Sequence, residues 1–150
     1  MTLSVTIAPL TAIGLAEAAA LYVAIFNAAP WHDAWTDATA RARLADFLHA
    51  PGASGLTARV SDNELAGFAL GNRERWFSGA HFNLRELCVA PAWQRRGIGT
   101  RLVQALEDSL RADGVERVYL LTTREGQAAA FYQRLGYYVS PKMALLAHRL

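Results

Sequence analysis

The sequence has little of what marks secreted, membrane or nucleic-acid-binding proteins. It contains a single cysteine, Cys88, so no disulfide can form within the chain, and a reducing compartment is expected. Its net charge is only +2, whereas a nucleic-acid-binding protein normally has a dense basic face. Residues 1–10 lack the charged start and long apolar run of a signal peptide, and no apolar stretch approaches the ~20 residues that cross a bilayer. These absences favour a soluble, cytoplasmic protein that binds neither nucleic acid nor membrane.

Metal-binding patterns and linkers are also missing. The four histidines, at positions 32, 49, 81 and 148, do not show the short spacings of metal ligands, so no metal is expected. What is present, 53% hydrophobic and 19% charged residues, is typical of a globular protein, and the length predicts one domain over residues 1–150.

Hydrophobic periodicity and turn residues predict the element order β-α-α-β-β-β-α-β-α-β-β. Strands are expected at residues 3–8, 56–60, 64–70, 84–89, 115–122, 137–140 and 144–150. Helices are expected at residues 12–28, from Thr36 or Asp37 to the stop at Pro51-Gly52, from Ile98 to the cap at Gly114, and at 127–135. Residues 71–81 read as a polar and aromatic connection. This mixture of helices and strands indicates an α/β (α+β) fold.

The stretch from Leu84 to Leu102 organises the rest of the chain. An apolar strand ends at Val89, Pro91 stops it, and a helix begins at about Ile98 after a basic turn with two glycines. Glycine lets the backbone approach a ligand closely, and the first amides of a helix lack intrahelical partners and attract anions. Arginines at positions 95, 96 and 101 add positive charge at the same place. The pattern predicts a strand–turn–helix that binds phosphate.

The spacing of this turn excludes two common nucleotide sites. A Walker loop needs Lys followed by Ser or Thr after the last glycine, but Gly99 is followed by Thr100 and Arg101. A Rossmann fingerprint needs a third glycine where Leu102 stands. Both standard nucleotide-binding patterns therefore fail.

The pattern Gln94-x-x-Gly97-x-Gly99, placed directly after the strand end, instead resembles the pyrophosphate loop of the GNAT superfamily of N-acetyltransferases, which bind acetyl-coenzyme A. A second motif, Ala128-Ala129-Ala130-Phe131-Tyr132-Gln133-Arg134-Leu135-Gly136-Tyr137, is similar to the family's Ala-x-x-Phe-Tyr-x-x-x-Gly-Phe segment. The predicted element order is also that of the family, so the resemblance covers the whole chain. It implies the GNAT fold, a mixed central sheet of six to seven strands flanked by four helices.

The resemblance implies that acetyl-CoA is bound by backbone groups of the turn and of the central strand. Amides between Arg95 and Thr100 would cradle the pyrophosphate, the strand edge would pair with pantetheine, and the Val89 amide would stabilise charge on the thioester oxygen. At position 125 the family usually has an asparagine that contacts the cofactor, so the part that Glu125 plays in holding pantetheine is in question. The cofactor-binding residues implied in this way are Leu87, Cys88, Val89, Gln94, Arg95, Arg96, Gly97, Ile98, Gly99, Thr100, Glu125 and Tyr132.

Tyr132 and Glu86 are the candidate catalytic residues. In the family the tyrosine of the second motif lies near the thioester sulfur, and a phenol with a pKa near ~10 can protonate a thiolate whose acid has a pKa near ~8.5. The alternative for Tyr132 is an aromatic core residue beside Phe131. A carboxylate on the central strand often removes the amine proton in the family, which implies Glu86 as the base. Strand alternation, however, puts Glu86 on the face with Leu84 and Cys88, so a structural charge pair, with a water chain that carries the proton, is the alternative.

A covalent route through an acetylated Cys88 is disfavoured. A buried cysteine usually serves as a small apolar residue, and no neighbour in the sequence would make this one a thiolate. We therefore expect direct transfer rather than a ping-pong mechanism.

Aromatic and acidic residues between the first two expected helices suggest the acceptor site, because in the family this connection forms one of its walls. Ring faces and carboxylates can hold a cationic amine. The alternative is a hydrophobic staple, in which Trp35 precedes a helix cap at Thr36 or Asp37. Trp76, with Phe77, lies in the polar connection and is the candidate for the other wall. The substrate-binding candidates are Trp31, His32, Asp33, Trp35 and Trp76.

The resemblance therefore implies an N-acetyltransferase that transfers an acetyl group from acetyl-CoA to a primary amine, by direct attack in a ternary complex. A small-molecule amine is favoured over a protein N-terminus or lysine, because the aromatic segment suggests an enclosed pocket. A non-catalytic acyl-CoA-binding sensor is the alternative of another class. The apolar strand expected at residues 144–147 leaves a homodimer open.

Overall fold

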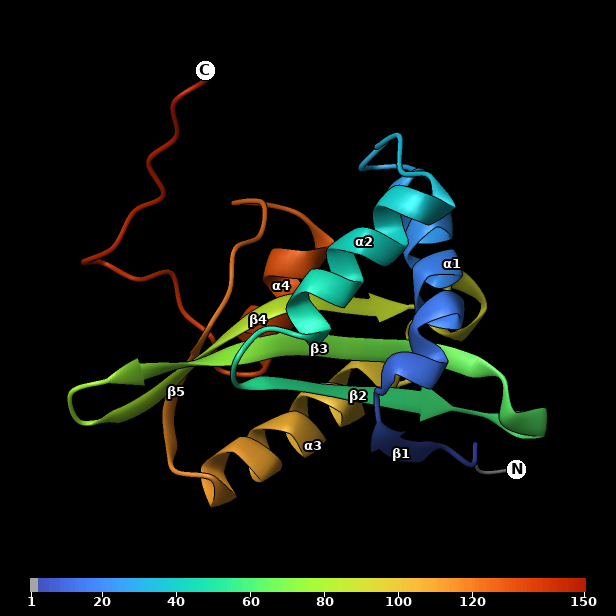
Figure 1. Cartoon of the computed structure of the whole chain (residues 1–150), viewed down its shortest axis with the longest axis horizontal. Helices are drawn as coiled ribbons and strands as arrows, with labels where there is room; N and C mark the ends of the chain where they lie inside the picture. The colour runs from blue at the N-terminus through green and yellow to red at the C-terminus, as the bar shows by residue number, and fades with distance from the viewer. Residues whose placement is uncertain (1–2) are drawn as a thin grey trace. The chain divides into compact units, whose positions relative to one another are not determined.

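A five-stranded sheet carries the larger part of the protein (Figure 1). In the computed structural model, which describes residues 3–150, the chain divides into a unit that ends at Leu120 and a unit of Leu121–Leu150. The strands of the first unit follow one another across the sheet: β1 (Thr6–Pro9), β2 (Ala53–Arg59), β3 (Leu65–Trp76), β4 (Gly79–Val89) and β5 (Val115–Tyr119). β1 to β4 are antiparallel to their neighbours, while β5 runs parallel to β4. The sheet is therefore mixed, as predicted.

Helices cover both faces of this sheet. α1 (Leu15–Phe26) and α2 (Asp37–Leu48) lie on one face, and α3 (Ile98–Ala112) lies on the other (Figure 1). A capping box between Thr36 and Thr39 begins α2. Parallel neighbours such as β4 and β5 need a crossover, and α3 provides it. The second unit contains α4 (Gln127–Arg134), so the four predicted helices are present. Within residues 3–150, no helix combines the length and the apolar character that a membrane crossing requires.

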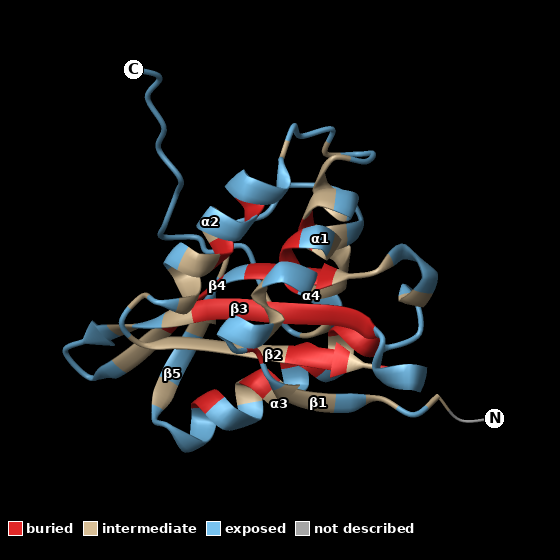
Figure 2. Cartoon of the chain, turned by 45° about the vertical axis from the view of Figure 1, so that its right-hand side comes forward, coloured by how far each residue is buried: buried red, intermediate tan, exposed pale blue. Residues whose placement is uncertain are grey.

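The core lies along β3. Figure 2 shows the buried residues concentrated in this strand and in the adjoining parts of β2 and β4. On the face of α1 and α2, Phe68 and Leu70 pack with Tyr22, and on the face of α3, Ile98 and Leu102 pack in a second cluster. Burial of each such side chain contributes about 1.5–3 kcal/mol. The strands that carry the candidate site are thus anchored on both faces.

The prediction of six to seven strands is wrong, because the sheet has five. Residues 137–140 and 144–150 form no strand, and apart from the half-buried Tyr137 their side chains are exposed, 72% for Tyr138 and 86% for Leu146. A strand needs a neighbouring strand for its backbone hydrogen bonds, and an apolar pattern alone does not supply one. The strand predicted at residues 115–122 ends at Tyr119. Pairing of residues 144–147 with a second copy stays a prediction.

The segment predicted as a connection, residues 71–81, is instead largely the outer half of the β3–β4 hairpin. Trp76 pairs with Gly79 across the turn, and Glu74 pairs with His81. Both strands are partly exposed in this half, so they need no apolar alternation. Because their composition is polar, the sequence pattern did not predict them as strands.

A β-bulge at Arg85 changes which side chains of β4 share a face. Leu70 pairs with Glu86, but the next residue, Gly71, pairs with Leu84, so Arg85 is the extra residue. Neighbouring residues of β3 point to opposite faces, and Glu86 and Leu84 therefore do so too. The expectation that Glu86 and Leu84 share a face is wrong, because alternation holds only while the register is regular.

Candidate active site

The turn between β4 and α3 is exposed and leaves the first amides of α3 without a capping side chain, although Ile98 and Gly99 themselves are buried. Residues 94–97 form the turn and are exposed, and Gly97, the N-cap residue, has a φ of 80°. No side chain caps this helix and no acidic residue lies in its first turn, whereas Thr36 caps α2. A Cβ added at Gly97 would meet no atom within 4 Å, so the space beside the turn is open. These features fit a diphosphate, which the amides at a helix N-terminus bind through their partial positive charge.

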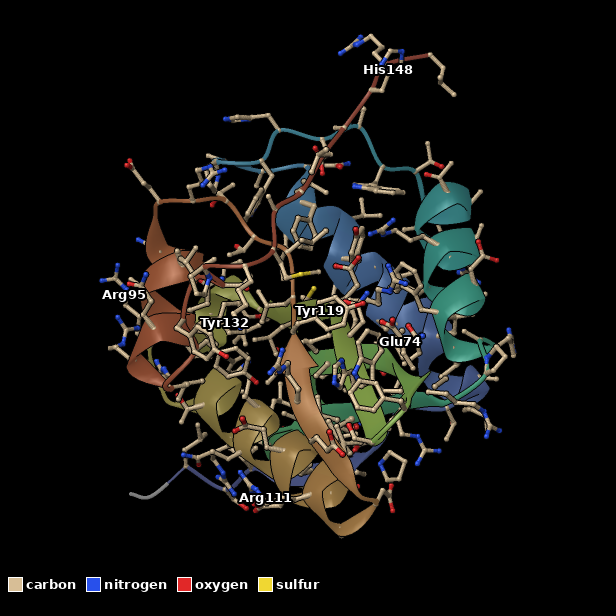
Figure 3. All side chains as sticks on the ribbon, turned by 90° about the vertical axis from the view of Figure 1, so that its left-hand side faces the viewer. Glu74, Arg95, Arg111, Tyr119, Tyr132 and His148 are labelled. Atoms are coloured by element: carbon tan, nitrogen blue, oxygen red, sulfur yellow. The ribbon has the colours of Figure 1, made fainter. Side chains whose placement is uncertain are left out.

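Arginines surround this turn without filling it. Arg95 is exposed and projects into solvent (Figure 3). The guanidinium carbon of Arg96 lies 5.2 Å from the ring centre of Trp93, and Arg101 donates to the Val5 carbonyl at 3.3 Å. Positive charge therefore gathers beside the uncapped N-terminus of α3.

The edge of β4 next to the turn has no strand beside it. β5 pairs with β4 only from Ala80 to Asn83, and among residues 3–150 no other strand lies on that side. At the end of β4, the Ala90 N–H donates to the Ala66 carbonyl at 2.7 Å. The residues of β4 between Asn83 and Ala90 therefore offer one backbone edge to a ligand.

Within that edge, the backbone groups of Leu87 and Val89 point away from β3. Backbone groups of an antiparallel strand point alternately to either side. Because Ala90 bonds to the β3 side, Cys88 also bonds to β3, and the N–H and C=O groups of Leu87 and Val89 point away from it. Gln94 braces the strand end, since its Nε2 donates to the Val89 carbonyl at 3.0 Å. The N–H groups of Leu87 and Val89 are thus placed to receive a ligand that pairs like an added strand.

A buried carboxylate lies beside this edge, on the face of α1 and α2. Glu86 is 6% exposed, and its Oε1 accepts from the Tyr22 hydroxyl at 3.2 Å and from the Arg43 Nε at 2.8 Å. The Arg43 guanidinium also lies over the rings of Phe47 (4.8 Å) and Trp35 (5.6 Å). The structural charge pair that was the alternative for Glu86 is therefore present.

Burial shifts the pKa values of Glu86 and Tyr22. It raises the pKa of Glu86 above its ordinary value, and the hydrogen bond and charge of Arg43 oppose the shift only in part. Burial, with the neighbouring carboxylate, also raises the pKa of Tyr22, so the phenol keeps its proton. A carboxylate with a raised pKa accepts protons more readily, so the ion pair is compatible with a base at Glu86.

Cys88 has the environment of an unreactive thiol. Burial raises its pKa well above the usual value, and the Glu86 carboxylate adds to the shift. The thiolate that a covalent route needs is therefore disfavoured at neutral pH.

A second polar group lies where β4 and β5 pair. The Tyr119 hydroxyl donates to the Glu74 carboxylate (Figure 3), and burial together with this carboxylate raises the pKa of Tyr119 to about 12. Asn83, the parallel partner of Tyr119, adds a side-chain hydrogen bond to the phenol. On the neighbouring strand, Asn72 accepts from the Arg85 Nε at 3.3 Å. No motif or spacing in the sequence predicts this group.

Hydrogen bonds among its own residues stabilise the segment between α1 and α2, residues 27–36. The Trp35 N–H donates to Asn27 Oδ1 and Asn27 Nδ2 donates to the Trp35 carbonyl, both at 2.8 Å. The Trp35 indole donates to Asp33 Oδ2 at 3.1 Å, and its ring packs edge-on against Tyr22 at 5.2 Å. These contacts fit the packing expected of a staple and engage the Asp33 carboxylate.

The remaining acceptor candidates are more exposed. Trp31 lies 5.5 Å from the ring of Phe26, and His32 is exposed with a φ of 52°. Trp76 is 52% exposed at the end of β3 and stacks on His81 at 4.7 Å. Their part in acceptor binding stays a prediction.

The smaller unit holds the second motif. In α4, the ring of Tyr132 packs edge-on against Phe131 at 5.1 Å and lies 5.4 Å from that of Tyr137. Glu125 precedes the helix, and its carbonyl accepts from the Thr123 hydroxyl at 2.8 Å. Tyr132 thus lies half-buried in an aromatic cluster, and its role as a general acid stays a prediction.

Tyr22 and Arg43 are the site residues that sequence reasoning missed. They lie 64 and 43 residues from Glu86, and neither belongs to a motif. The one available signal was Arg43 itself, a charge beside the inward-facing Leu44 and Phe47 of α2, where a cation needs a partner. Among the described residues, no group of three or more His, Cys, Asp or Glu side chains is arranged to hold a metal ion.

Solved structures of three proteins share the fold. A probable acetyltransferase is 17% identical with a TM-score of 0.81, and 97% of each chain is covered. The aminoglycoside N-acetyltransferase AAC(6')-Iy, in complex with CoA, is 17% identical with a TM-score of 0.77, over 100% of this chain and 98% of that one. The aminoglycoside acetyltransferase meta-AAC0020, from an uncultured soil metagenomic sample and in complex with sisomicin, is 18% identical with a TM-score of 0.74, over 97% and 95%. At these identities the likeness concerns the fold alone.

The family is shown at the level of sequence. No curated protein sequence matches the chain significantly. A model described as the acetyltransferase (GNAT) family, however, matches residues 18–137, which is more than half of the chain. The match contains the turn at residues 94–100 and the motif around Tyr132. The chain belongs to the acetyltransferase (GNAT) family.

Proposed function

We propose that the protein is an acetyl-CoA-dependent N-acetyltransferase that acts on a primary amine of a small molecule. One observation carries the proposal: an exposed turn and the uncapped N-terminus of α3 follow directly after a stretch of β4 with an unpaired edge. The first feature suits a diphosphate and the second suits an extended chain that bears amides. Coenzyme A has both parts, and the family match and the CoA-bound relative support the same ligand.

In this proposal the backbone binds and orients the cofactor, which supplies the acetyl thioester. The amides of residues 97–100 hold the diphosphate, and Leu87 and Val89 pair with the pantetheine arm. The N–H of Val89 stabilises negative charge that develops on the thioester oxygen. Tyr132 donates a proton to the departing thiolate.

Glu86 is the proposed base. Arg43 and Tyr22 fix the position of its carboxylate, and burial raises its pKa toward the range in which a base works at neutral pH. Because the carboxylate is only 6% exposed, we assign to water the transfer of the proton from the amine. The acceptor site is proposed to be lined by Trp31, His32, Asp33, Trp35 and Trp76.

Titration calorimetry with acetyl-CoA and a thiol-release assay on a panel of amines test the proposal. We expect binding, turnover on at least one amine, and a kcat about 10²-fold lower for Tyr132→Phe, with little change in the affinity for acetyl-CoA. Tyr138→Phe, at an exposed tyrosine of the same unit, is the matched control and should leave both values unchanged.

Two results would contradict it. Acetyl-CoA binding without turnover on any amine would favour a sensor on the same fold. Absence of binding would remove both the transferase and the sensor.

A further inference from the structure

The bulge in β4 brings a second charged residue to the face that carries Glu86. In a regular strand Arg85 and Glu86 would point to opposite faces. Arg85 is the extra residue of the bulge, and its guanidinium carbon lies 5.2 Å from the ring centre of Phe47 in α2. Arg85 therefore lies on the α2 face together with Glu86.

Protein contacts hold Arg85 in place without an ion pair among the described residues. Its Nε donates to Asn72 Oδ1 at 3.3 Å, and the Phe47 ring supports the guanidinium. Among residues 3–150, Arg85 takes part in no ion pair, although it is exposed. A guanidinium fixed in this way has lost side-chain freedom before any ligand arrives, which favours two-pronged binding of a carboxylate.

The carboxylates near this arginine are already engaged. Glu86 accepts from Arg43 and Tyr22, and Glu74 accepts from Tyr119. Both carboxylates are therefore hydrogen-bonded within the protein, and Glu86 is also paired with the Arg43 cation. An acceptor with a negative group would find Arg85.

We propose that Arg85 binds a carboxylate of the acceptor, and that the acceptor is an amine of the amino-acid class. The inference rests on the proposed N-acetyltransferase function and names its substrate class. Arg85 lies two residues before Leu87, at the start of the proposed thioester edge. An acceptor bound at Arg85 therefore lies next to that edge, which suits a compact molecule whose amine and carboxylate are a few bonds apart.

Matched pairs of acceptors test this inference. The thiol-release assay, with acetyl-CoA in excess, compares free L-amino acids that have apolar, aromatic, acidic and basic side chains with their α-carboxamides. We expect kcat/KM to be at least about tenfold higher for the best amino acid than for its carboxamide, because a charge-assisted bond is lost in the carboxamide. The carboxamide has the less basic amine, so unassisted chemistry would favour the opposite order.

Variants assign the preference to the side chain. Arg85→Gln should raise KM for that amino acid roughly 10- to 100-fold, with little change in kcat and little change for the carboxamide. Arg85→Lys keeps the charge but lacks the planar guanidinium. Its KM for the amino acid should therefore lie between those of the unchanged protein and Arg85→Gln. Arg75→Gln, at an exposed arginine of β3 that alternation places on the opposite face, is the control and should change neither substrate.

The outcomes separate this inference from the proposed function. Turnover without a preference for the carboxylate, or equal losses on both substrates in Arg85→Gln and Arg85→Lys, would overturn the inference and leave the transferase intact. Failure of acetyl-CoA to bind in the calorimeter would remove the transferase, and the inference with it.

Discussion

The turn before α3 and the polar face beneath α1 and α2 are built in opposite ways. The turn uses the main chain of consecutive residues, 94–100, and its arginines stay at the surface. The face uses side chains from distant parts of the chain, since Tyr22 and Glu86 are 64 positions apart. One region offers uncapped backbone amides beside an exposed turn, and the other removes a carboxylate from solvent. The first depends on local geometry, and the second depends on the packing of the whole sheet.

This contrast predicts where substitutions act. A change in the exposed turn should weaken ligand binding, because the turn holds the ligand in the proposed function. A change in the buried face should destabilise the fold first, since an uncompensated buried charge is costly.

The largest effect is expected for Arg43→Met. It leaves the Glu86 carboxylate buried without its cation, and we expect the free energy of unfolding to fall by about 2 kcal/mol near neutral pH. This value lies below that of a fully buried pair, because the Arg43 side chain is 40% exposed. Urea denaturation measures it. The double variant Arg43→Met, Glu86→Leu should recover most of the loss, and a loss as large as that of the single variant would contradict the explanation.

The pH dependence of the same variant gives a second check. Glu86 has a pKa above its ordinary value near 4.5 in the folded state, so its proton stabilises the fold below that value. This stabilisation by the bound proton is lost as the pH rises through the folded pKa of Glu86. Arg43 lowers the folded pKa of Glu86, so in Arg43→Met that pKa is higher and the loss of stability continues to higher pH. The deficit of Arg43→Met should therefore be larger at about pH 8 than at about pH 4, and an equal deficit at both would speak against an ionised Glu86.

Two glycines of α3 give the next largest effect and a matched pair. Gly97 precedes the helix and Gly114 follows it, both have a φ of 80°, and an added Cβ at either would meet no atom within 4 Å. Alanine at either position should cost about 1–2 kcal/mol of stability from backbone strain alone. Only Gly97→Ala should weaken acetyl-CoA binding, by roughly tenfold, because only that end carries the free amides. Equal affinity in both variants, measured by calorimetry, would refute diphosphate binding at this turn.

The sequence predicted the regions of the fold that depend on neighbours in the chain. The start of α3 at Ile98, the cap of α2 at Thr36 and the four helices follow from periodicity and capping residues. The exposed turn could be located in the same way, because its glycines and its strand end lie within a few residues of each other. These features need no long-range information.

What the sequence could not reveal depends on pairing. The bulge at Arg85 shows only in the register between β3 and β4, and it moves Leu84 to the face opposite Glu86. The partners of Glu86 come from α1 and α2 and share no motif with β4. Strands at residues 137–140 and 144–150 were predicted from apolar pattern alone, and neither segment pairs with the sheet.

The smallest effect concerns the arginines at the turn. Arg95 is exposed and takes part in no ion pair within the described chain, so its contribution to anion binding is that of a screened surface charge. Arg95→Gln should weaken acetyl-CoA binding only about two- to fivefold, and the deficit should shrink as salt is raised. Arg111→Gln, at the other end of α3, should leave the affinity unchanged. A loss for Arg95→Gln as large as that for Gly97→Ala would mean that side chains, rather than amides, hold the anion, and the contrast between the two regions would then disappear.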